Sequence, residues 1–222
     1  MNGGNSKDVP LGRTRAASAR SRSIRAALLS AALLSSCAFL APRPDPSRFY
    51  VLAPVPPPEK PVPAFEAVLG LGPVDFPDYL ERPNFVVRLS STRLDFSERS
   101  RWAEPLDANF QRTLAENLSR LLRPKKIESF PWFGNPRLDY QVEIEVLEFE
   151  VDAEGTARLA ARWALRDGKT KKLLDSGEAR FEEPSEGKTT AARVAALSRA
   201  LGKFSDELAR ALRRVASGGR PA

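Results

Sequence analysis

The chain has 222 residues, and its 35 Lys or Arg against 28 Asp or Glu give a formal net charge of +7. It has no histidine and one cysteine, Cys37, so the commonest general base and metal ligand is missing. We also find no glycine-rich phosphate loop, Gly-x-Ser-x-Gly elbow or paired metal-ligand spacing. A hydrolase with two carboxylates needs no histidine, but no acid pair is singled out by its spacing. We therefore predict no catalytic and no metal-binding residues, and rank an envelope enzyme last.

Residues 1–36 have the three parts of a bacterial secretory signal. A basic stretch comes first, then an apolar run over residues 26–34, then Ser35 and Ser36 just before Cys37. The run is too short to span a bilayer, which is typical of a signal peptide. The ending Leu34-Ser35-Ser36-Cys37 resembles the lipobox, in which the thiol is acylated before cleavage. We predict that residues 1–36 are removed and that Cys37 carries the lipid, the only attached group expected.

The alternative for Cys37 is a buried structural cysteine, which is the usual environment of a free thiol. The three prolines that follow within residues 42–46 argue against it, because proline lacks a backbone donor and fits neither a helix nor a sheet interior. We expect residues 37–47 to be the lipidated cysteine and a proline-rich tether.

Loss of the signal peptide changes the charge balance. It removes six basic groups (Lys7, Arg13, Arg15, Arg20, Arg22 and Arg25) and one acidic group (Asp8), which leaves 29 and 27 and a net charge of +2. The basic character of the full chain is therefore mostly that of the signal peptide. We expect no nucleic-acid partner, since such proteins carry a basic surface.

The first half of the domain, predicted over residues 48–214, alternates strands and loops. We predict strands at 48–52 and 65–74, a proline-rich surface loop between them at 54–63, and a hairpin of 84–89 with 93–96. Apolar residues then recur every three or four positions from Leu106 to Leu121. This spacing predicts an amphipathic helix that begins near Pro105 and stops before Pro124.

The second half predicts a meander and a closing helix. Apolar residues alternate from Tyr140 to Val146, and the phase slips by one at Leu147, which we interpret as a β-bulge. The next strand has an arginine face, which we expect to pair with Glu143 and Glu145. A third strand runs from Lys172 to Phe181, and a helix spans residues 194–212. The predicted fold class is α+β: one domain with a mostly antiparallel sheet and two amphipathic helices packed on it, and a flexible tail at 215–222.

Three segments in this order resemble the ABC-type transport auxiliary lipoproteins: Arg48–Leu52, Pro77–Pro83, and Arg101–Leu106 leading into a helix. The stretch from Tyr140 to Phe149, followed by Trp163 and a long terminal helix, is similar to the second half of the same domain. The resemblance covers about residues 47–213. The best-known member of this family is the lipoprotein subunit of the paraquat-inducible (Pqi-type) intermembrane transport system.

The resemblance implies a non-catalytic, lipid-anchored subunit at the outer membrane, facing the periplasm. Relatives accompany an ABC ATPase, a permease and an MCE-domain periplasmic protein that handles phospholipids or other hydrophobic molecules. The implied role is to dock the MCE channel to the outer membrane, sometimes as a homo-oligomeric ring. Ala38 after the lipidated Cys37 lacks the acidic retention signal of inner-membrane lipoproteins. The alternative function is that of a periplasmic carrier with its own lipid cavity. An outer-membrane assembly lipoprotein of the lipopolysaccharide-export type, also a sheet with two helices, would have a similar structure.

Four residues are candidate partner contacts, each with a structural alternative. Arg82 before Pro83 is also explained by a turn, and Trp102 by a place in the core beside the first helix. Trp132 and Phe133 lie between two prolines and before Gly134. The pair offers apolar area to a membrane or a neighbouring subunit when exposed, although burial is the favoured interpretation.

Overall fold

The computed structural model describes residues 45–218, so the predicted signal peptide, Cys37 and most of the tether lie outside it. Every element below belongs to one compact unit, Pro46–Ala222. The elements are β1 (Arg48–Tyr50), β2 (Phe65–Asp75), the 3-10 helix η2 (Asp78–Leu80), β3 (Asn84–Ser90), β4 (Arg93–Trp102), α2 (Leu106–Leu122), β5 (Pro124–Ser129), β6 (Tyr140–Asp152), β7 (Thr156–Asp167), β8 (Leu173–Pro184) and α3 (Thr190–Ala216).

Strand β6 organises the sheet. On one edge it begins the antiparallel meander β6-β7-β8. Its other edge is shared, because the first part, Tyr140–Glu145, pairs with β2 and the end, Val151–Asp152, pairs with β3. Two wings therefore extend from β6: β2 with β5, and β3 with β4 and β1. The longest ladders are antiparallel and the shorter ones are parallel, as the fold class predicted.

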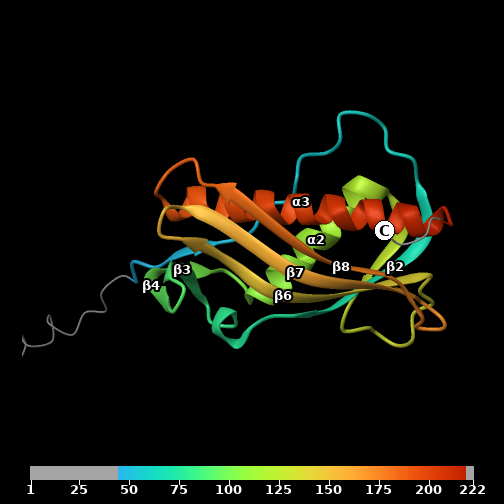
Figure 1. The fold of residues 1–222 in the computed structure, drawn as a ribbon, viewed down its shortest axis with the longest axis horizontal. Helices are drawn as coiled ribbons and strands as arrows, with labels where there is room; N and C mark the ends of the chain where they lie inside the picture. Colours follow the sequence, from blue (N-terminus) through green and yellow to red (C-terminus); the bar gives the residue numbers. More distant parts are fainter. Residues whose placement is uncertain (1–44, 219–222) are drawn as a thin grey trace, which may run out of the picture. The chain divides into compact units, whose positions relative to one another are not determined.

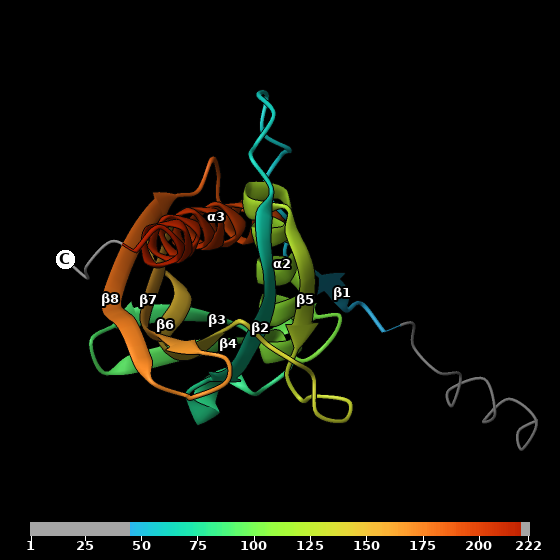
Figure 2. The same cartoon turned by 90° about the vertical axis from the view of Figure 1, so that its right-hand side faces the viewer.

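Both helices lie against one face of the curved sheet, and Figures 1 and 2 show them inside the curve. Helix α3 packs on β6, β7 and β8, whereas α2 packs on β2, β5 and α3. Phe110 of α2, Phe149 of β6 and Phe204 of α3 fill the space between, each at most 1% exposed. Neighbouring ring centroids are 5.3 Å (Phe110 to Phe149) and 6.4 Å (Phe110 to Phe204) apart.

The helix ends follow local chemistry. The Thr189 side chain accepts from the backbone N–H of Ala192 and so caps α3, as Thr commonly does at an N-cap. Helix α2 ends with Leu122, and its C-cap residue Arg123 adopts a left-handed conformation with φ of 50°. Pro124, next in the chain, cannot continue a helix, and it begins β5 instead.

The predicted β-bulge is confirmed. In the ladder with β7, Val146 pairs with Ala161 and Glu148 with Ala160, so Leu147 is the extra residue. Phe149 is consequently 1% exposed. The bulge keeps the apolar residues on both sides of the slip facing the helices.

Several boundaries differ from the prediction. The first strand ends at Tyr50 rather than Leu52, and the second strand of the hairpin continues to Trp102. Strand β5 was not predicted, because Ile127 is its only large apolar residue after Pro124 and gives no alternating pattern.

Candidate functional site

The segment Leu52–Val55, which follows β1 and the tether, lies between the two helices. Its backbone N–H groups donate to α2 and α3: Leu52 to Asn109 Oδ1 at 3.2 Å, Ala53 to Ser198 Oγ at 3.1 Å and Val55 to Asn117 Oδ1 at 2.8 Å. Pro54 has no N–H to donate. Every donor of this segment is therefore satisfied by a side chain of one of the helices. We call this arrangement the tether groove.

The helices supply the groove with polar groups and space. Asn109 and Asn117 are 0% exposed, and Asn117 also donates to Ser205 Oγ of α3 at 2.9 Å. A Cβ on Gly202 would lie 2.5 Å from a methyl carbon of Val55, so only glycine lets the segment approach α3 this closely.

The tether groove fixes the start of the domain to its core. Arg120 of α2 adds a hydrogen bond to the Val55 carbonyl, and Leu52 is 2% exposed. Since a buried amide that loses its partner costs about 1–3 kcal/mol, the segment is held on the helices. The segment that follows β1 thus has a fixed place between the two helices.

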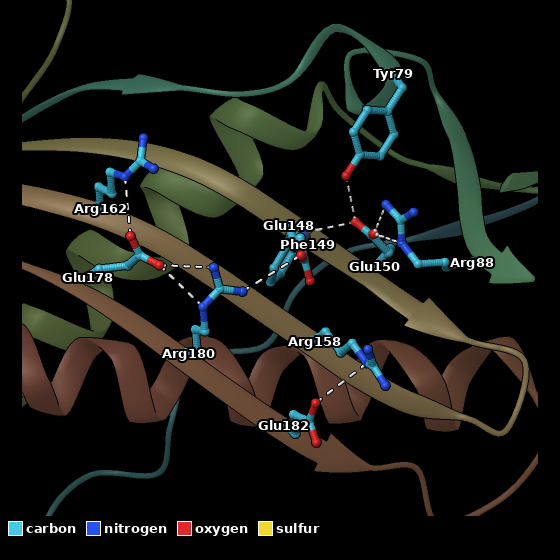
Figure 3. A network of polar contacts seen from close by, with 10 residues as sticks. All are labelled: Tyr79, Arg88, Glu148, Phe149, Glu150, Arg158, Arg162, Glu178, Arg180 and Glu182. Carbon is cyan, nitrogen blue, oxygen red and sulfur yellow. Dashed lines mark hydrogen bonds and ion pairs between the residues drawn. The ribbon is translucent and has the colours of Figure 1, made fainter. Parts of the chain in front are cut away.

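A second polar cluster links the segment Pro77–Pro83 to β6. The side chain of Glu150 is fully buried. Its carboxylate accepts hydrogen bonds from Tyr79 Oη at 2.8 Å and from Arg88 Nε at 2.6 Å, as Figure 3 shows. Burial, followed by the Glu150 charge, raises the pKa of Tyr79 well above its usual range, so the phenol stays protonated and donates. The cluster lies where the pairing partner of β6 changes from β2 to β3.

The solvent face of β6, β7 and β8 is covered by ion pairs, as the arginine pattern predicted (Figure 3). Arg166 binds Glu143 at 2.7 Å, and Arg162 lies 3.3 Å from both Glu145 and Glu178. A hollow of about 480 Å³ on this face is lined by several of these charged groups. The face therefore offers charge of both signs beside apolar groups such as Ile144 and Trp163.

Residues 130–138, which we call the aromatic loop, present apolar side chains to solvent between β5 and β6. Phe133 at its tip is fully exposed (102%), and Phe130 is 42% exposed. Trp132 is half-buried: its ring packs edge-on against Phe130, with centroids 5.5 Å apart, and it approaches Gly70 of β2. The favoured burial interpretation is thus wrong for Phe133 and holds in part for Trp132.

The aromatic loop and the turn between β7 and β8 enclose a pocket of about 500 Å³. Three cations line it, Arg137 from the loop and Lys169 and Lys171 from the turn, together with Trp132. We call these cations and the adjacent Lys172 the basic rim. None of the four forms an ion pair within residues 45–218.

The other predicted contacts lie elsewhere, on the β3 and β4 wing. Arg82 is exposed, with its guanidinium 5.1 Å from the centre of the Phe96 ring. Trp102 is 5% exposed and packs at 5.7 Å on Phe85, so in this structure it is a core residue and has no free ring face for a partner. Its backbone N–H donates to the Pro83 carbonyl, which brings two of the motif segments together.

Comparison with protein families now identifies the chain. The model of the ABC-type transport auxiliary lipoprotein component matches residues 50–209, which include the tether groove, the Glu150 cluster and the aromatic loop. The chain belongs to this family. A comparison with curated proteins gave no match.

Two solved structures share the family fold. Protein XCC0632 from Xanthomonas campestris superposes with a TM-score of 0.67 at 19% identity, over 78% of this chain and 98% of that one. An uncharacterized protein superposes with a TM-score of 0.61 at 22% identity, over 75% of this chain and 98% of that one. At these identities the likeness concerns the fold alone. No helix within residues 45–218 is long and apolar enough to cross a bilayer.

Sequence reasoning missed the tether groove and the basic rim. A signal for the groove existed, because Asn109, Thr113 and Asn117 recur every four residues beside the apolar stripe and so share one helix side. The rim was visible as a Lys-Thr-Lys-Lys run at residues 169–172. What the sequence did not indicate is that Arg137 joins this run across a pocket.

Proposed function

We propose that this transport auxiliary lipoprotein is a non-catalytic subunit of an MCE-type ABC system that moves phospholipid or other hydrophobic molecules between membranes. Its role is to dock the periplasmic channel to the outer membrane, where Cys37 anchors it. The observation that carries the positional role is the tether groove. A module whose anchor-proximal segment is bound to its own core at three amides holds its partner surface at a defined place relative to the tether.

The filled interior supports docking over the alternative of a lipid carrier. A carrier needs an apolar cavity of a few hundred Å³ that buries its ligand. Here the rings of Phe110, Phe149 and Phe204 occupy the space between sheet and helices. The hollows on the described surface at β6–β8 and at the aromatic loop are open to solvent and lined by charged and apolar groups together, so neither is an enclosed apolar cavity.

Placement at the outer membrane rests on the predicted anchor. Cys37 is followed by Ala38, without an acidic residue that would retain a lipoprotein at the inner membrane. A tether of about ten residues reaches roughly 30 Å when extended. Binding through such a tether raises the local concentration of the partner at one membrane without any chemistry.

The test is a binding experiment with an MCE-domain protein from the same organism. Residues 38–222, without the signal peptide and anchor, are mixed with the periplasmic domain of that protein and examined by pull-down and native mass spectrometry. We expect a specific complex that contains several copies of this chain, weakened by Arg82→Glu and unchanged by Arg93→Glu in the neighbouring hairpin. A monomer that ignores the MCE domain and copurifies with stoichiometric lipid would establish the carrier function instead.

A further inference from the structure

The end of the sheet where β6 begins combines exposed apolar side chains with unneutralised positive charge. Of the six large hydrophobic side chains that are exposed in the described chain, three lie here: Phe130, Phe133 and Leu173. The basic rim belongs to the same two segments, the aromatic loop and the turn between β7 and β8. Figure 1 shows the aromatic loop and the turn between β7 and β8 at this end, away from β3 and β4.

We propose that this end is a second membrane contact, which binds the surface of a bilayer containing anionic phospholipid. Phe133 and Leu173 enter the interface, and the pocket between the loop and the turn receives a lipid phosphate between Arg137, Lys169 and Lys171. Aromatic rings favour the headgroup region of a bilayer, and Lys or Arg near an anionic surface gain free energy from its negative potential.

The lack of carboxylate partners distinguishes the rim from the rest of the sheet. On the solvent face the arginines of β7 and β8 are bound by Glu143, Glu145 and Glu178. The nearest acid of the turn, Asp167, is already occupied, since it accepts the backbone N–H groups of Lys169 and Thr170 and the Thr170 hydroxyl. These hydrogen bonds shape the turn. The Lys171 ammonium donates to the neutral Gln141 Oε1 at 2.9 Å, which leaves its charge without a carboxylate partner.

The composition of the rim favours a membrane over a protein partner. Three of its four cations are lysines, which are depleted at the cores of protein interfaces, whereas lysines are effective with anionic lipid because they need no fixed geometry. A fully exposed Phe133 beside Gly134 also suits insertion between lipids, because it needs no complementary pocket.

The inference is tested on residues 46–222, which contain the whole hydrophobic core and lack the anchor. The protein is floated with vesicles of phosphatidylethanolamine and phosphatidylglycerol, and with vesicles of phosphatidylcholine alone. We expect binding to the anionic vesicles only, and loss of it in 1 M salt, where charges are screened beyond about 3 Å. Equal flotation with both vesicles, or none with either, would overturn the proposal.

Matched variants locate the contact. Lys169→Glu with Lys171→Glu should lower the bound fraction more than tenfold, at about fivefold per charge removed, and Phe133→Ser should lower it severalfold. The controls are Arg93→Glu with Arg99→Glu and Phe49→Ser, all exposed on the other wing, and these should bind like the wild type. Controls that lose binding equally would remove the assignment to this end.

The result does not depend on the MCE partner. Flotation with anionic vesicles and no complex with the MCE domain would leave this inference standing and overturn the proposed function. If Phe133→Ser in the aromatic loop abolishes the complex with the MCE domain and the wild type does not float, the aromatic loop is a protein contact and the lipid assignment is wrong.

Discussion

At the scale of single residues, the buried and half-buried charges of this domain are held by specific partners. Glu150 is satisfied by Tyr79 and Arg88, and Asp175 by Arg214 at 2.6 Å. Glu183 of β8, with a side chain 10% exposed, binds Lys203 and Arg199 of α3. Each pair joins a strand to a different element. These carboxylates therefore help to hold η2 and β3 against β6, and α3 against β8.

Glu183 gives a prediction with a defined pH dependence. Its pKa is lowered, first by the hydrogen bond from Lys203, against the opposing effect of burial. A folded-state pKa below the unfolded value of about 4.3 means that the carboxylate stabilises the fold above that pH, and that this contribution is lost as the pH falls through the folded pKa. Glu183→Gln should lower the free energy of unfolding by about 1 kcal/mol at pH 7.

Urea melts from pH 7 to pH 3 check this expectation. The difference between wild type and Glu183→Gln should close as the pH falls below about 4. The control is Glu182→Gln on the solvent face, whose side chain is 66% exposed and which should stay within about 0.5 kcal/mol of wild type. A difference for Glu183→Gln that stays constant with pH would mean that its charge is not the stabilising feature.

At the scale of elements, the bulge in β6 decides which residues face the helices. Leu147 is inserted between Val146 and Glu148, so Phe149 packs at 5.3 Å on Phe110. Phe149→Ala should cost about 3–5 kcal/mol in unfolding free energy, the usual loss for a buried aromatic. Glu148→Ala, whose side chain is 36% exposed, should stay within about 0.5 kcal/mol. Similar small effects of both variants in denaturant melts would show that Phe149 contributes nothing to the core.

At the scale of the whole molecule, we predict that a lipid anchor on Cys37 acts together with the domain. A single acyl chain binds a membrane only marginally, whereas a diacylglyceryl group with an added N-acyl chain holds a protein there almost permanently. In cells, Cys37→Ser should abolish palmitate labelling and leave a precursor of full length, while Ser36→Ala, with another small residue before the cut, should be processed. Normal labelling and size of Cys37→Ser would disprove the anchor.

The sequence alone determined what is periodic or local. Spacings of three and four in Leu106–Leu121 and Val194–Leu212 indicated both helices, and a slip of one residue indicated the bulge, because side-chain direction repeats with fixed period in helices and strands. The pairing of the arginine face with Glu143 and Glu145 followed from the same alternation. The family resemblance also came from short segments in a fixed order.

Only the tertiary structure decided the features that depend on contacts between segments distant in the sequence. The tether groove joins Leu52–Val55 to residues 109–120 and 198–202, and the basic rim joins Arg137 to Lys169 and Lys171. β5 is a strand because β2 offers an edge, and Trp102 is buried whereas Phe133 is exposed. Both are large aromatic residues in the sequence. Their burial depends on whether another element covers them, which no local pattern contains.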